Sequence, residues 1–100
     1  MEQPDAIIHQ PVRLKIMSAL RALPAEDPIE FVRLKAVVGA TEGNLGAHIA
    51  TLEEAGYVCV EKDFVAKRPR TRIGLTKAGR RAFEQYVNYL RDIIEAATPS

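Results

Sequence analysis

The chain has 100 residues, 47% of them hydrophobic, a formal net charge of +1 and a single cysteine, Cys59. This length suits one domain with one small hydrophobic core and argues against a two-domain protein. Because the overall charge is close to zero, the chain is not a polycation, and a surface for nucleic acid would have to come from an uneven distribution of charge. The lone cysteine excludes an intramolecular disulfide and fits a reducing compartment.

No run of the sequence approaches the roughly 18 apolar residues of a membrane span. Residues 1–11 also lack a basic segment followed by an apolar one, the order typical of a secretory signal. We therefore expect a cytoplasmic protein with no membrane partner.

Basic residues are concentrated in one part of the chain. Between residues 62 and 81 there are eight Lys or Arg residues and one acidic residue, Asp63, whereas the rest of the chain is net negative. This asymmetry predicts a basic patch on one surface of the domain.

The first part of the chain predicts two helices around a short strand. Pro11 suits the first turn of a helix, which Pro24 would end. Residues 29–31 would form a brief strand before a second helix over 32–38, with Gly39 as its stop. The apolar residues of the first helix recur at helical spacing: Val12, Ile16, Ala19, Leu20 and Leu23.

Thr41 is a good N-cap for a third helix. Only Ala40 separates it from Gly39, and so short a link between two amphipathic helices is typical of a helix-turn-helix. The inward stripe and the end of this helix are predicted at Leu45, Ile49, Leu52, Ala55 and Gly56.

Two runs follow in which every second residue falls on the same face of a strand, and this period of two predicts a β-hairpin. Val58, Val60 and Phe64 share one face of the first strand, and Thr71, Ile73 and Leu75 give the second strand the same period. The tip, residues 65–70, carries three cations and a proline, which suits an exposed turn. Thr76 would cap a last helix that runs from Lys77 to about residue 96. Its apolar stripe comprises Phe83, Tyr86, Val87, Leu90, Ile93, Ile94 and Ala97.

Residues 9–90 resemble a winged helix-turn-helix transcriptional regulator of the MarR/ArsR-like type, in particular its small stand-alone members. The stretches that carry the resemblance are HQPVRLKIMSAL, TEGNLGAHIATLEEAGYV, KRPRTR and LTKAGRRAFEQY. The resemblance implies an α+β, mostly helical fold with a two-to-three-stranded β-wing and a long C-terminal helix. It also implies one domain over residues 1–100, with a core at about 9–76, and a homodimer in which helix 77–97 takes part.

In this reading the third helix, residues 41–55, is the recognition helix. Its outward face is small and weakly polar, and its predicted DNA-binding residues are Thr41, Gly43, Asn44, Ala47, His48 and Thr51. Asn44 and Thr51 suit base edges or phosphates, and Ala47 suits a thymine methyl. Related regulators often carry a serine and an arginine or another polar residue where Gly46 and Ala47 stand here, so direct readout would be modest. The alternative is an exposed helix face that serves only solubility and packing.

His48 lies at the edge of the apolar stripe, and the resemblance places a histidine here in many related recognition helices. It could contact a phosphate, or it could be a half-buried histidine satisfied by a backbone carbonyl. Because His9 and Cys59 are its only soft companions, we predict no metal site and no cofactor.

The wing, residues 62–72, is predicted to contact the DNA backbone or an adjacent minor groove. Its predicted DNA-binding residues are Lys62, Lys67, Arg68, Arg70 and Arg72, with Arg68 and Arg70 favoured for the minor groove. The alternative is a solvated charged turn that protects a sheet edge. Three further cations, Lys77, Arg80 and Arg81, open the last helix. They would meet an external partner, or they would pair with Glu84 and Asp92 or with acids of a neighbouring chain.

The last helix would be about 30 Å long at 1.5 Å per residue. A 100-residue domain has a radius of gyration near 13 Å, so the distal stripe is expected to overhang its own core. We predict a two-fold dimer that places two recognition helices on a palindromic operator. Its predicted contact residues are Ile7, Ile8, Tyr86, Leu90, Ile93 and Ile94. The alternative is a monomer in which the N-terminal segment packs on the last helix.

These features together predict a sequence-specific regulator of transcription that binds double-stranded DNA. A winged-helix module for protein–protein interaction is the alternative, and the charged wing argues against it. An enzyme is disfavoured because the sequence has no phosphate-binding glycine loop and no paired-carboxylate site. No cluster of residues points to an effector.

Overall fold

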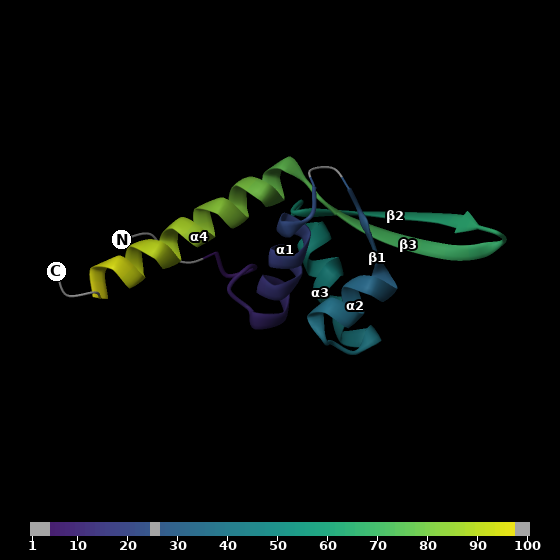
Figure 1. Ribbon diagram of the computed structural model, residues 1–100, viewed down its shortest axis with the longest axis horizontal. Coiled ribbons are helices and arrows are strands. Elements are labelled where there is room, and N and C mark those ends of the chain that lie inside the picture. The colour runs from purple at the N-terminus through teal and green to yellow at the C-terminus, as the bar shows by residue number, and fades with distance from the viewer. Residues whose placement is uncertain (1–4, 25–26, 98–100) are drawn as a thin grey trace.

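The computed structural model describes residues 5–24 and 27–97. Four helices and three strands follow one another as α1 Pro11–Ala22, β1 Ile29–Glu30, α2 Phe31–Val38, α3 Glu42–Glu54, β2 Val58–Val65, β3 Arg68–Leu75 and α4 Lys77–Ala97 (Figure 1). The predicted order of elements and the α+β class are confirmed.

Local signals begin and end the helices where the sequence predicts them. The side chain of Gln10 accepts a hydrogen bond from the Arg13 N–H and caps α1. Gly39 ends α2 with φ of 75°, a left-handed backbone that glycine adopts readily. The Thr41 hydroxyl accepts from the Asn44 N–H at the start of α3, and the Thr76 hydroxyl accepts from the Gly79 N–H at the start of α4.

The three strands form an antiparallel sheet in the order β1-β3-β2. β2 and β3 pair over their whole length, from Val58 opposite Leu75 to Val65 opposite Arg68. The turn therefore has only two residues, Ala66 and Lys67, both with positive φ, as in the type I′ turns that match the twist of a hairpin. The prediction of a longer tip over 65–70 was wrong, because the strands extend nearly to the turn.

The hydrophobic core lies where α1, α2, α3, the base of the sheet and the first half of α4 meet. It contains the predicted inward stripe of α3, Leu45, Ile49 and Leu52, together with Ile8 from the N-terminal segment. Its other buried members are Ile16, Met17, Leu20, Ile29, Leu34, Val38, Val58, Ile73, Phe83 and Tyr86.

Two arms project from this core in opposite directions, the β2–β3 hairpin on one side and the distal half of α4 on the other (Figure 1). The molecule measures 59 × 25 × 22 Å, and its radius of gyration is 15.0 Å, larger than the roughly 13 Å of a compact domain of this length. We call the hairpin, residues 58–75, the wing.

Within residues 5–24 and 27–97 there is no helix with the length and apolar character needed to cross a bilayer.

Candidate nucleic-acid interface

The outer face of α3 is exposed and chemically sparse. The hydroxyl of Thr51 donates to the Ala47 carbonyl within the helix, at 3.2 Å, and the hydroxyl of Thr41 is engaged in capping. The side chains of Asn44 and Glu54 make no hydrogen bond with the described residues. The exposed members of the face are Gly43, Asn44, Ala47, Ala50, Thr51 and Glu54.

His48 is half-buried, and its partner is a side chain instead of a backbone carbonyl. Its Nδ1 lies 3.0 Å from a terminal nitrogen of the Arg13 guanidinium on α1. Because arginine only donates, Nδ1 must be the acceptor, and a neutral ring then carries its hydrogen on Nε2. Burial and, second, the charge of Arg13 lower the pKa of His48. α3 thus holds a neutral imidazole.

Arg13 is itself held by the N-terminal segment, residues 5–10. Its Nε donates to the Ile7 carbonyl at 2.5 Å, while the Asp5 carboxylate caps the same turn by accepting from the Ile7 N–H at 2.9 Å. The other Asp5 oxygen accepts from the Tyr57 hydroxyl at 2.5 Å. That hydrogen bond, followed by burial and the charge of Asp5, raises the pKa of Tyr57 to about 12.

The N-terminal segment also reaches α4, because a 2.8 Å hydrogen bond joins His9 Nδ1 to the Tyr86 hydroxyl. It therefore links α3, the base of the wing and α4. Sequence reasoning missed this network. Its members lie 35 to 77 residues apart along the chain, so no local pattern signals it.

The strand register divides the wing into two sides, since paired residues of an antiparallel ladder point to the same face. The helix-facing side consists of Val58, Val60, Lys62 and Phe64 with their partners Leu75, Ile73, Thr71 and Pro69. Val58 and Ile73 are buried against the core. Lys62 and Thr71, further out, line a groove of about 350 Å³ whose opposite wall includes Gly46 and Ala50 of α3.

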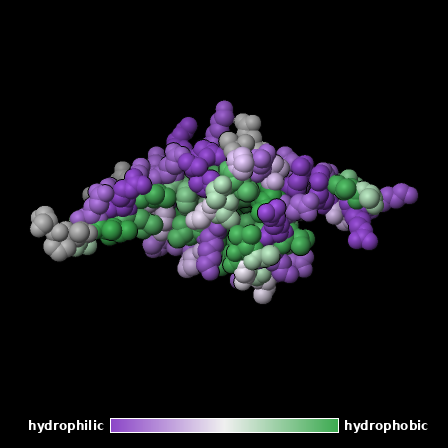
Figure 2. Space-filling model, in the orientation of Figure 1, coloured by the Kyte–Doolittle hydropathy of each residue, from purple (hydrophilic) through white to green (hydrophobic). Residues whose placement is uncertain are grey.

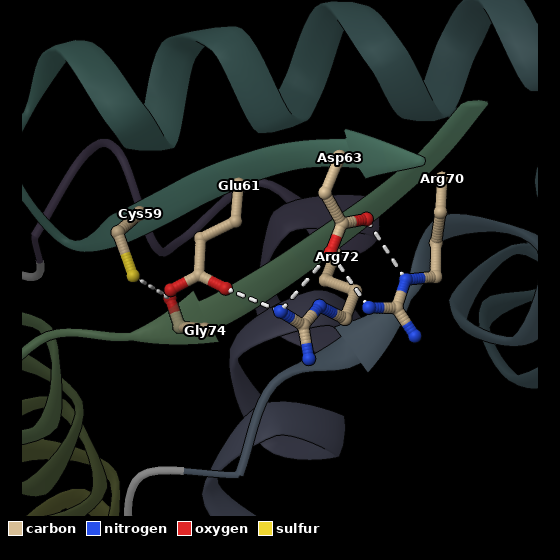
Figure 3. A network of polar contacts seen from close by, with 6 residues as sticks. All are labelled: Cys59, Glu61, Asp63, Arg70, Arg72 and Gly74. Carbon is tan, nitrogen blue, oxygen red and sulfur yellow. Dashed lines mark hydrogen bonds and ion pairs between the residues drawn. The ribbon is translucent and has the colours of Figure 1, made fainter. Parts of the chain in front are cut away.

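The outer side of the wing consists of Cys59, Glu61, Asp63 and Val65 with Gly74, Arg72, Arg70 and Arg68. Its charges pair across the strands (Figure 3). The Asp63 carboxylate accepts two hydrogen bonds from Arg70, at 2.9 and 2.6 Å, and Arg72 lies 3.0 Å from Glu61 and 3.6 Å from Asp63. The hydrogen bond from Arg70 is the main cause that lowers the pKa of Asp63.

The five cations predicted to bind DNA therefore fall into two groups. Arg70 and Arg72 are ion-paired on the side of the wing that faces away from α3. Lys62, Lys67 and Arg68 are exposed, and none of them makes an ion pair or side-chain hydrogen bond with the described residues. The sequence, which places four cations within six residues, overstates the free charge of the wing.

The base of the wing is built around Gly79 in the first turn of α4. A Cβ at this position would overlap the Tyr57 carbonyl, which also accepts a hydrogen bond from the Thr76 N–H at 3.1 Å. The Thr76 hydroxyl donates to the Gly56 carbonyl at 2.6 Å. The entry of α4 is thereby packed against the turn between α3 and β2.

The cations that open α4 do not pair with Glu84, as one of the two alternatives had predicted. Glu84 instead meets Arg21 of α1 at 3.4 Å. Lys77, Arg80 and Arg81 form no ion pair within residues 5–24 and 27–97, so their charge remains available on the surface.

The predicted dimer residues also separate into two groups. Ile8 and Tyr86 are 0% and 4% exposed, so they belong to the core of their own chain and offer no contact surface to a partner. Ile7 and Leu90 are half-buried at its edge. Ile93 and Ile94, at 42% and 64% exposed, lie on the projecting part of α4, where Figure 2 shows hydrophobic residues along one side of the helix.

A helix-turn-helix, a following β-wing and an exposed helix face beside it define a winged-helix domain. Residues 12–94 match the model of the winged helix DNA-binding domain, and the chain belongs to this family. An uncharacterized protein of Methanocaldococcus jannaschii is 38% identical over 81 residues, which are 81% of this chain and 85% of that protein. A transcriptional regulator homologue from Pyrococcus horikoshii has a TM-score of 0.82 at 32% identity, over 93% of this chain and 89% of the other.

More distant solved structures share the fold. Staphylococcus aureus MepR, in a complex with DNA, has a TM-score of 0.72 at 17% identity over 90% of this chain and 74% of its own. A MarR family regulator from Silicibacter pomeroyi has a TM-score of 0.70 at 21% identity, over 94% and 63%. The fold is thus the MarR-like winged helix, and the protein belongs to a family of DNA-binding domains, not of enzymes.

Proposed function

We propose that the protein is a sequence-specific transcriptional regulator that sets α3 in the major groove of double-stranded DNA and its wing against the neighbouring backbone. One observation carries the proposal: Lys62 of the wing shares a groove with Gly46 and Ala50 of α3. Beyond this groove, at the wing tip, Lys67 and Arg68 make no ion pair with the described residues. Cations without intramolecular partners can neutralise phosphates at no cost in broken ion pairs.

The contacts divide by chemistry. On α3, Asn44 and Thr51 meet base edges, Ala47 meets a thymine methyl, and His48 offers its Nε2–H to an acceptor. Gly43 and the capped N-terminus at Thr41 leave backbone N–H groups near a phosphate. On the wing, phosphate contacts come mainly from Lys62, Lys67 and Arg68. Arg70 and Arg72 contribute only if a phosphate replaces a carboxylate.

The proposed active form is a homodimer on a palindromic operator. Beyond the core, α4 carries exposed apolar residues, and Leu90, Ile93 and Ile94 with Ile7 would form the contact. Two recognition helices would then address half-sites about one DNA turn apart. Sedimentation equilibrium tests this assembly. Ile93→Glu should yield a monomer, whereas Val37→Glu, at an exposed position of α2, should leave the dimer intact. A monomeric wild-type chain would refute it.

Selection from a random duplex pool tests the function directly. Palindromic winners are expected for the wild-type chain, and weaker recovery at the same salt for a variant with Lys62, Lys67 and Arg68 changed to alanine. If no sequence is enriched even at low salt, DNA binding is wrong, and the winged-helix module for protein–protein interaction becomes the better proposal.

A further inference from the structure

An exposed aromatic side chain lies near the end of the wing. Phe64 is 75% exposed, although it stands on the same side of β2 as the buried Val58. Its cross-strand partner is Pro69, so the helix-facing side ends in an apolar pair two rungs beyond the pair of Val60 and Ile73. Figure 2 shows hydrophobic residues at this end of the wing with hydrophilic ones around them.

We propose that Phe64, backed by Pro69, is an apolar wedge that enters the minor groove beside the recognition helix and partly unstacks a base step. This inference rests on the proposed DNA-binding function and adds a contact that none of the cations supplies. Apolar side chains of this kind kink duplexes when inserted between base pairs from the minor groove.

The position of Phe64 fits such a contact. It lies four residues beyond Val60, which packs on the core next to α3, and four residues of strand span about 13 Å. The minor groove adjacent to a bound major groove is half a helical turn away, about 17 Å. Phe64 therefore lies beyond the groove that Lys62 shares with α3, on the helix-facing side of the wing, and its distance along the strand from Val60 is comparable with the spacing between adjacent DNA grooves.

The surroundings of Phe64 favour DNA over a protein partner. Lys62 lies next to it on the helix-facing side, and Lys67 and Arg68 form the tip, all three without ion pairs to the described residues. An apolar pair among free cations complements an apolar base stack between phosphate backbones. A Phe and a Pro on a two-stranded ribbon also cover far less than the roughly 800 Å² per partner of a stable protein interface.

The test compares wild type, Phe64→Ala and Phe64→Leu, with Val37→Ala as the matched control. Val37 is also exposed, at 61%, but lies on α2 away from the wing. The probe is a duplex of the selected sequence with a donor and an acceptor dye at its ends and with 2-aminopurine replacing one adenine at a time. Energy transfer reports bending, and 2-aminopurine fluorescence reports unstacking.

Wild type and Phe64→Leu should bend the duplex and raise 2-aminopurine fluorescence at one position per half-site. Phe64→Ala should abolish both signals and weaken affinity about tenfold, the scale of a single base–aromatic stack, with an unchanged dependence of affinity on salt. Val37→Ala should behave as wild type. If Phe64→Ala binds, bends and unstacks like wild type, the wedge is wrong while DNA binding stands. If wild type binds no duplex at low salt, the proposed function itself fails.

A contact of Phe64 with a second copy of the chain would give a different result. Sedimentation of the free chain would then change with Phe64→Ala while binding, bending and unstacking of DNA stayed the same, and that result would overturn the proposal.

Discussion

The two sides of the wing are built from the same eight-residue strands but differ in how their cations are paired. Arg68, although on the outer side, lies opposite Val65 near the tip and makes no ion pair with the described residues. On the outer side, Arg70 and Arg72 are neutralised by Asp63 and Glu61 across the strands. The helix-facing side runs from a buried base through Lys62 to the exposed Phe64. The strand register decides whether a cation of the hairpin has a carboxylate opposite it. The number of cations in the sequence therefore does not by itself give the positive charge that the hairpin can offer to DNA.

The largest expected effect comes from the base that both sides share. Gly79→Ala would place a methyl group against the Tyr57 carbonyl and force α4 away from the turn that begins β2. We expect a loss of about 3 kcal/mol in the free energy of unfolding, as for a severe overpacking change. Urea denaturation measures it, with Gly43→Ala, where a Cβ meets open space, as the control. Equal stability of the two variants would show that the α4 entry can shift.

The free cations should dominate DNA affinity. Replacing Lys62, Lys67 and Arg68 by alanine should reduce the slope of log affinity against log salt by about 2.7 per subunit, since each phosphate that a cation neutralises adds about 0.9 to the slope. Titrating a fluorescent duplex at several salt concentrations measures the slope. An unchanged slope would show that neither the tip nor the helix-facing side of the wing binds phosphates.

The ion-paired cations provide the matched comparison. Arg70→Gln and Arg72→Gln together should change the salt slope by well under one, because both guanidiniums already have carboxylate partners. The cost in stability should be small, since surface ion pairs contribute little. The opposite change, Asp63→Asn, should release Arg70 and steepen the slope. If the double variant lowered the slope as much as the loss of the three free cations, ion pairing would not decide which cations of the wing bind phosphates.

The smallest effect concerns pH. His48 has a pKa below its ordinary 6.5 in the folded chain, so folding favours the neutral ring. Its contribution to stability is present above about pH 6.5 and is lost as the pH falls through the lowered value, because the unfolded chain takes up the proton first. Urea denaturation at pH 7.5 and pH 5 should show a smaller decline for His48→Gln than for wild type. Arg13→Met, which removes the charged neighbour, should fall between them.

The sequence by itself determined the elements and their inward faces. Pro11, Gly39, Thr41 and Thr76 mark helix ends through geometry that acts within a few residues, and the stripe of α3 follows from helical periodicity alone. The resemblance to winged-helix regulators rested on these same local features. They were enough to predict the fold, including the third helix and the wing.

Only the tertiary structure decided which residues of those elements are exposed and unpaired, and so can contact DNA or a second chain. A shift of one residue in register would exchange the two sides of the wing, and the sequence predicted a tip over residues 65–70 that is longer than the two-residue turn at Ala66 and Lys67. The burial of Ile8, the contact of Arg13 with His48 and the close approach of Gly79 to Tyr57 join residues far apart in the chain. Such contacts depend on how the elements pack, because no local pattern of residues records what lies opposite a side chain in the folded domain.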